Sequence, residues 1–300
     1  MARLSRQYVK LCDVRDFDDP EVTRVLRDIL PEREPDLYRE RKVWEFAMLA
    51  LFLEDAGRLA DETEVLAVGA GDERMAFWLA NRVGRVVASD VYGEGLFADR
   101  EAEASMLTDP ASHAPFPYRE ERLEVIRADG RRLPFEDASF DVVYSLSSIE
   151  HFGLPEDIAA AAAEMGRVLR PGGHALVATD CFVRRDPLNA APVDFAVRLA
   201  SLGRRRRRAG PRRRAMLGEI FTGRELERLI VRPSGLRLLQ PLDVTVSPET
   251  WDNLTVLHTD GSTDPATGEK YPHILLRADR SVFTSAVLAL EKPGAVSTRV

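Results

Sequence analysis

The chain has 300 residues, of which 45% are hydrophobic and 30% charged, and its formal net charge is −7. This size suits one large globular domain, or one domain with an insertion, and excludes a small disulfide-stabilised scaffold. Cys12 and Cys181 lie far apart and lack the spacing of metal ligands, so we expect no metal site and a cytoplasmic protein. No run of about 18 apolar residues occurs, so no membrane association is expected.

Charge is distributed unevenly along the chain. Residues 204–214 contain eight arginines, so the remaining body is strongly acidic. An acidic body argues against a nucleic-acid-binding surface, which is typically basic. The arginine run has two interpretations: a solvated loop, or a lid segment that recognises an anionic ligand.

The first 60 residues are predicted to be helical. Apolar residues recur at helical spacing between residues 40 and 53, and Asp55-Ala56-Gly57 ends this helix. Because the helix precedes the first predicted strand, it would either cap a ligand pocket or only pack on the core.

From residue 64 onward, short apolar strands alternate with helices, which is typical of a mostly parallel sheet with helices on both faces. Strands are predicted at 64–68, 85–89, 123–127, 140–145, 174–179, 236–239 and 283–290. Helices are predicted at 75–82, 155–169 and 222–230. Thr222 and Glu225 form a capping box at the start of the last helix, and Pro171-Gly172-Gly173 predicts a turn.

Two segments interrupt this alternation. One contains the arginine run, and the other, residues 241–280, is rich in Pro, Asp, Gly and Thr. We therefore divide the chain into an N-terminal helical cap, residues 1–60, and an α/β domain, residues 61–300. The α/β domain would carry a lid or insertion at 185–218 and a second insertion at 241–280.

The first predicted strand leads into Gly69-Ala70-Gly71, which is followed by a helix. Glycines at such a turn let a ligand approach the backbone where side chains would clash. Asp90 ends the second strand, 21 residues after Gly69, where a carboxylate can accept both hydrogen bonds of a ribose diol. Together these features predict a ligand that contains adenosine, although Asp90 alone could be a solvated residue at a strand end.

NAD and S-adenosylmethionine (SAM) both contain such a ribose. The dinucleotide motif G-x-G-x-x-G requires glycine or alanine at position 74, where this chain has Arg74. A pyrophosphate needs the close helix approach that the third glycine permits, whereas the methionine tail of SAM does not. The sequence therefore favours SAM over NAD.

Four blocks follow one another between residues 64 and 180: VLAVGAG, VVASDVY, RADGRRLPFEDASFDVVYSLSSIEH and EMGRVLRPGGHALVAT. On these blocks the chain resembles the class I SAM-dependent methyltransferases, in the large group often called type 11. The resemblance implies a Rossmann-like fold with a seven-stranded, mostly parallel sheet, helices on both faces and a C-terminal antiparallel strand. It also implies SAM as the cofactor.

The resemblance assigns roles to residues along the predicted cofactor site. Gly69, Ala70 and Gly71 should pass under the methionine portion of SAM. Asp90 should bind the ribose hydroxyls, with Val91 beside the adenine.

The same comparison assigns the far ends of the cofactor. Asp129 should accept a hydrogen bond from the adenine amino group, and the Gly130 amide should face a ring nitrogen. Ser145, Leu146 and Ser147 should approach the sulfonium side.

Two positions depart from the family pattern. Ala67 stands where the family usually has an acid that holds the methionine amino group, and Glu73 stands where it usually has glycine. Asp72, Glu73 or Glu45 could supply the missing carboxylate. If none does, we expect SAM binding to be weak or lost. These two departures also leave open the alternative of a catalytically silent SAM-binding or interaction module.

A hydroxyl acceptor must lose a proton during methyl transfer, and a histidine near neutral pKa suits that role. His151, in the sequence that follows the fourth strand of the core, is the first candidate base; the alternative is that it packs at the start of the next helix. Asp180 and Tyr92 are further candidates. Asp180 and Asp186 show no recognisable metal-ligand pattern.

The predicted function is methyl transfer from SAM to a small molecule, at an oxygen of a sugar or a specialised metabolite. The acceptor would be anionic if the arginine run recognises it. The oligomeric state is left undecided, with a homodimer as one possibility. An RNA or protein methyltransferase is the alternative, disfavoured by the acidic body and by SLSS after the fourth strand, where enzymes acting on planar nitrogen carry Asn-Pro-Pro-Tyr. His258 and His273 are expected to be structural.

Overall fold

The structure, a computed structural model, describes residues 4–34, 37, 39–95, 98, 101–185, 219–258, 261–268 and 271–294. The arginine run and nearly all of the predicted segment 185–218, Asp186 included, lie outside these residues. None of the helices in the described part of the chain has the length and hydrophobicity that a bilayer crossing requires.

One sheet of 11 strands runs through the described residues, in the order β4-β3-β2-β5-β6-β11-β10-β8-β9, and β1 and β7 also pair with β11. The strands are β1 (Lys10–Leu11), β2 (Glu64–Val68), β3 (Arg85–Asp90), β4 (Leu123–Arg127), β5 (Phe140–Leu146), β6 (Leu169–Arg184), β7 (Arg237–Leu238), β8 (Leu254–Leu257), β9 (Thr263–Pro265), β10 (Leu275–Ala278) and β11 (Ser281–Glu291).

The predicted fold class is confirmed by the pairing of these strands. Five strands run parallel to one another, in the order β4, β3, β2, β5 and β6. β11 runs antiparallel to β6, and β7 pairs with β11. These are the seven strands expected of the Rossmann-like domain. The apolar strands β2 and β5 lie at its centre and are almost completely buried.

The sheet has more than the expected seven strands because three strands pair along one edge of the long strand β11. β7 pairs near Leu290, β1 pairs at Ala286 and Val287, and β10 pairs near Phe283. β8, β9 and β10 all come from the predicted insertion at 241–280, which therefore extends the sheet.

Strand β6 differs from its prediction. It begins at Leu169, five residues early, and the predicted turn at residues 171–173 is an irregularity within it. Pairing with β5 shifts between Leu169 and His174, and the Gly172 amide donates to Lys292 O at 2.8 Å. Gly172 has a φ of 76°, so Pro-Gly-Gly keeps a turn-like backbone within the strand.

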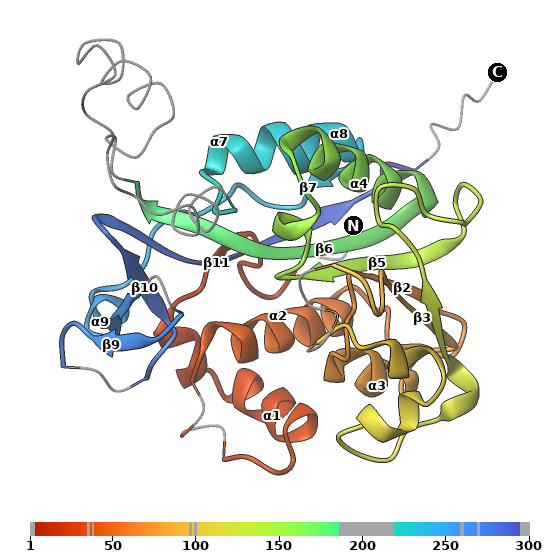
Figure 1. Cartoon of the computed structure of the whole chain (residues 1–300), viewed down its shortest axis with the longest axis horizontal. Helices are drawn as coiled ribbons and strands as arrows, with labels where there is room; N and C mark the ends of the chain where they lie inside the picture. Colours follow the sequence, from red (N-terminus) through yellow and green to blue (C-terminus); the bar gives the residue numbers. More distant parts are fainter. Residues whose placement is uncertain are drawn as a thin grey trace.

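Helices cover both faces of the sheet. They are α1 (Pro20–Ile29), α2 (Arg41–Asp55), α3 (Arg74–Ala80), α4 (Pro155–Val168), α7 (Gly223–Leu226), α8 (Arg232–Ser234) and α9 (Pro248–Trp251), with short 3₁₀ turns at Val14–Asp18, Ala104–Leu107, Pro110–His113, Glu120–Arg122 and Ile149–His151 and a π turn at Glu227–Val231 between α7 and α8. α1, α2 and α3 lie on one face and α4, α7 and α8 on the other (Figure 1).

The predicted helix signals hold in the structure. Pro155 opens α4, with Glu156 and Asp157 in its first turn, where their charges favour the positive end of the helix. Thr222 and Glu225 form the reciprocal capping box of α7, with Thr222 N donating to Glu225 Oε2 at 2.8 Å.

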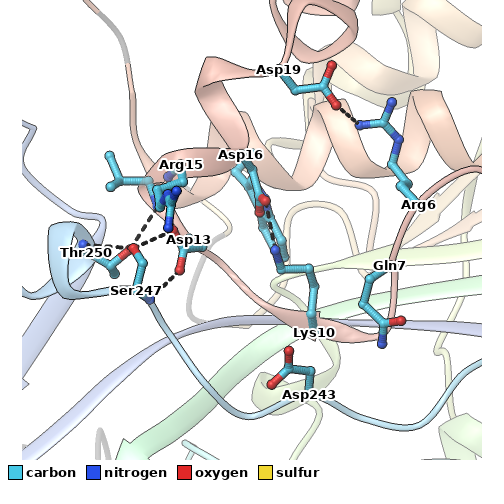
Figure 2. Close-up of polar contacts among 12 residues, drawn as sticks. Arg6, Gln7, Lys10, Asp13, Arg15, Asp16, Asp19, Asp243, Ser247 and Thr250 are labelled. Carbon is cyan, nitrogen blue, oxygen red and sulfur yellow. Dashed lines mark hydrogen bonds and ion pairs between the residues drawn. The ribbon is translucent and has the colours of Figure 1, made fainter.

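The N-terminal segment is tied into the sheet and into the segment that follows β7. Besides the β1–β11 pairing, Leu11 N donates to Asp243 O at 3.1 Å. Asp13 accepts from Ser247 N and from Ser247 Oγ, and Lys10 pairs with Asp16 (Figure 2). The division into a cap and a separate α/β domain remains a prediction.

Candidate active site

A cavity of about 920 Å³ opens at the carboxyl ends of the parallel strands. Its wall includes Gly69 after β2, Asp90 at the end of β3, Leu146 at the end of β5 and Asp180 in β6. This edge is where parallel α/β sheets bind their ligands, because the loops there diverge and leave a crevice. The predicted cofactor residues therefore meet at the expected place.

The glycine turn packs too closely for side chains. Gly69 and Gly71 have φ of 69° and 50°. A Cβ on Gly69 would lie 2.4 Å from Ser148 Oγ, and one on Gly71 would lie 2.6 Å from Glu101 O. Glycine satisfies both the left-handed backbone and the tight space, so the turn can form a smooth wall of the cavity.

Asp90 is held by the backbone of this turn. Its Oδ2 accepts from Gly71 N at 2.9 Å, and its Oδ1 accepts from Val91 N at 2.7 Å. Burial raises the pKa of Asp90, and the two amide hydrogen bonds offset only part of that rise. Each carboxylate oxygen keeps a further lone pair, so the group can still accept hydrogen bonds from a diol in the cavity.

Asp129, Gly130 and Ser145 do not line the cavity. Asp129 is paired with Arg131 at 2.7 Å, and this hydrogen bond lowers the pKa of Asp129. A Cβ on Gly130 would lie 2.6 Å from Phe152 Cε2, so the Phe152 ring covers this residue and itself faces the cavity. Ser145 is buried within β5.

Helix α2 supplies charged groups to the cavity, in line with the capping alternative for this helix. Lys42 pairs with Glu73 and lies 3.6 Å from Glu45 Oε2, while its Nζ donates to Leu146 O at 3.0 Å. Glu45 also accepts from the Ser147 hydroxyl at 2.7 Å. Leu146 and Ser147, both expected near the sulfonium, thus lie beside a cluster of charge.

His151 lies among acidic groups at another part of the wall. Its Nδ1 is 3.4 Å from Glu219 Oε2. Burial by itself lowers the pKa of His151, but the adjacent carboxylate of Glu219 and the charge of Glu150 outweigh it and raise the pKa.

Two further carboxylates lie on the same part of the wall. Burial raises the pKa of Glu150 to about 7, and Glu150 accepts from Thr179 Oγ1 at 2.8 Å. Asp180 is paired with Arg41. This part of the cavity can therefore bind hydroxyl groups and accept a proton.

The remaining candidates divide between wall and interior. Tyr92 is buried, and its hydroxyl donates to Gly71 O at 2.7 Å, so it supports the glycine turn. His258 pairs with Asp264 at 2.6 Å away from the cavity, whereas His273, expected to be structural, lines it.

Sequence reasoning did not single out Arg41, Lys42 or Glu219 as site residues. Arg41 and Lys42 lie at the start of the predicted helix that precedes the first strand. Because this helix was a candidate cap of the pocket, its first residues could have been identified as candidates for the wall. Glu219 follows the arginine run, and its sequence context gave no signal.

Comparison with known proteins identifies the fold's relatives. A family model described as "Methyltransferase domain" matches residues 66–177. A Mycolicibacterium smegmatis protein named "Probable S-adenosylmethionine-dependent methyltransferase" is 33% identical over 184 residues, which cover 58% of this chain and 70% of that protein. The chain belongs to the class I SAM-dependent methyltransferase superfamily.

Other similarities to this methyltransferase are partial or distant. "Methyltransferase GfsG" of Streptomyces halstedii is 34% identical over 122 residues, 40% of this chain and 38% of that protein. Geranyl diphosphate C-methyltransferase of Streptomyces coelicolor A3(2) is a solved structure with 14% identity, covering 96% of this chain and 90% of that one with a TM-score of 0.49.

Proposed function

We propose that this methyltransferase uses SAM as its methyl donor, bound across the glycine turn with the ribose on Asp90. The observation that carries the proposal is the Asp90 carboxylate, fixed at the cavity wall by the amides of Gly71 and Val91. The turn beneath it is packed against Ser148 and Glu101 and carries no side chain into the cavity at Gly69 and Gly71. When bound, SAM supplies an activated methyl group, and the protein's task is to align the acceptor with it.

The remaining cofactor contacts are proposed by position. Gly69, Ala70 and Gly71 would lie under the methionine portion, and Val91 would lie beside the adenine. Leu146 and Ser147 line the cavity near the proposed sulfonium position.

Three assignments concern residues next to the cavity wall. Asp129 and Gly130 are proposed for the adenine and Ser145 for the sulfonium side, although none of them reaches the wall in this structure. Phe152, whose ring lies against Gly130, is an additional aromatic group at the adenine end.

We propose His151 as the base that removes a proton from an acceptor hydroxyl, in O-methylation of a small molecule such as a sugar or a specialised metabolite. His151 shares the cavity with Asp90 and has Glu219 to stabilise its protonated form. The carboxylates of Glu150 and Asp180 beside it suit an acceptor rich in hydroxyls better than an anionic one.

Calorimetric titration with SAM, S-adenosylhomocysteine and NAD tests the cofactor. We expect the first two to bind with micromolar dissociation constants and NAD not to bind. Asp90→Ala should abolish binding while the protein stays folded. Glu124→Ala, which removes an exposed carboxylate from the neighbouring strand β4, should bind as the wild type does. Unchanged affinity in Asp90→Ala, or no SAM binding by the wild type, would contradict the proposal.

A further inference from the structure

Three charged side chains from two elements meet at one part of the cavity wall. Lys42 and Glu45 come from α2, and Glu73 immediately precedes α3. All three line the cavity, and Lys42 lies between the two carboxylates. They join the N-terminal part of the chain to the loop that follows the glycine turn.

This cluster has unused capacity to accept hydrogen bonds. Glu45 Oε2 and Glu73 Oε2 are both buried, and neither accepts a hydrogen bond from any described residue. A buried carboxylate oxygen is stabilised by a hydrogen-bond donor, so each of these oxygens can accept a hydrogen bond from a ligand in the cavity. Two carboxylates face one ammonium group, so the cluster can accommodate one more cation.

The position of this cluster relative to Asp90 determines which part of a bound ligand would reach the cluster. In the sheet, β3 and β5 flank β2 on opposite sides. Asp90 ends β3, whereas Lys42 is anchored to Leu146 O at the end of β5. A ligand with its ribose on Asp90 that crosses the glycine turn therefore ends at this cluster.

Ala67 provides no carboxylate for the amino-acid end of SAM, which the cluster could supply instead. Residue 67 is an alanine, whereas the methyltransferase family that this chain resembles usually has an acidic residue at this position. The Ala67 methyl group is fully buried in β2. Ala67 can neither pair with an amino group nor reach the cavity. Any charge complement for the amino-acid end of SAM must come from other residues of the wall.

We propose that Lys42, Glu73 and Glu45 recognise the amino-acid end of SAM, which carries one ammonium and one carboxylate group. Glu73 and Glu45 accept hydrogen bonds from the ammonium group, and Lys42 pairs with the carboxylate. This inference rests on the proposed use of SAM. It makes the site selective for ligands that keep the amino-acid end over those with adenosine alone.

The test compares two ligands that share adenosine. S-adenosylhomocysteine has the amino-acid end, and 5′-methylthioadenosine lacks it. We expect Glu73→Gln and Lys42→Met each to weaken S-adenosylhomocysteine binding about tenfold or more, since lost charge-assisted hydrogen bonds have this magnitude. Binding of 5′-methylthioadenosine, measured by the same calorimetric titration, should stay within experimental error of the wild type.

Glu32→Gln is the matched control. Glu32 pairs with Arg74, the neighbour of Glu73, at 2.9 Å but does not line the cavity, so its loss should leave both affinities unchanged. Melting curves establish that each variant is folded. Unchanged S-adenosylhomocysteine affinity in Glu73→Gln and Lys42→Met, or an equal loss for both ligands, overturns this inference alone. Failure of the wild type to bind either ligand overturns the proposed SAM site itself.

Discussion

The ionisation of His151 depends on opposing effects of its neighbours. Burial disfavours the imidazolium, whereas the adjacent carboxylate of Glu219 and the charge of Glu150 favour it more strongly. The pKa of His151 therefore lies above its ordinary value of 6.5. A base acts in its neutral form, so activity that needs His151 is lost as the pH falls through this raised pKa.

Replacing His151 by alanine should slow methyl transfer by about 10²–10⁴-fold, the usual contribution of a general base, without weakening S-adenosylhomocysteine binding. Glu219→Gln should move the acid limb of the kcat–pH profile to lower pH, because it removes an interaction that raises the pKa of His151. Methyl-transfer kinetics from pH 5 to 9, with an acceptor whose free hydroxyl receives the methyl group, measure both effects. His258→Ala, outside the cavity, serves as control, and full activity of His151→Ala would remove it as the base.

At the scale of elements, one glycine sets how closely two helices approach. Gly166 lies in α4, and a Cβ there would be 1.9 Å from Ser234 O in α8. Glycine is normally unfavourable inside a helix relative to alanine, by about 1 kcal/mol. Here the absence of a side chain lets α4 pack directly on the backbone that precedes β7.

Gly166→Ala should therefore destabilise the protein despite the better helix propensity of alanine. We expect the free energy of unfolding to fall by about 1–3 kcal/mol, as for other overpacked sites. Urea denaturation measures this change. Ala160→Ser, at an exposed position of the same helix, should stay within about 0.5 kcal/mol of the wild type. Equal or greater stability of Gly166→Ala would show that Ser234 can move away at little cost.

At the scale of the whole molecule, the chain's N-terminal segment holds the segment after β7 in place. Asp13 accepts from Ser247 N at 2.5 Å, from Ser247 Oγ at 2.8 Å and from Arg15 N at 3.0 Å (Figure 2). Burial alone would raise the pKa of Asp13, but these hydrogen bonds to the charged form lower it overall. Residues more than 200 positions apart are thus joined through one carboxylate.

Because the pKa of Asp13 is lower in the folded protein, its ionised form stabilises the fold. This contribution is complete above the unfolded pKa of about 3.9 and disappears as the pH falls through the folded value. Asp13→Asn should lower the free energy of unfolding at pH 7 by about 1–2 kcal/mol, and by less at pH 3. Denaturation at the two pH values measures the difference. A deficit that is the same at both would contradict this role, and Asp252→Asn, at an exposed position nearby, is the control.

The sequence by itself determined the elements whose causes are local. Apolar runs predicted β2, β3 and β5 within one residue, because a strand buried on both faces needs nearly continuous apolar side chains. The edge strand β4, which is only partly buried, also lies where it was predicted. Glycine sterics and strand ends likewise placed the Gly69–Gly71 turn and Asp90 on one cavity wall.

Tertiary structure alone decided which charges meet in that cavity. Lys42 contacts Leu146, 104 residues away, and Glu219 approaches His151 although the two residues lie far apart in the sequence. The same holds for β6, which runs on to Arg184, five residues past its predicted end, because it pairs with β11 along that length. Local patterns specify backbone conformation, whereas ion pairs and shared strand edges depend on distances that exist only once the elements have packed.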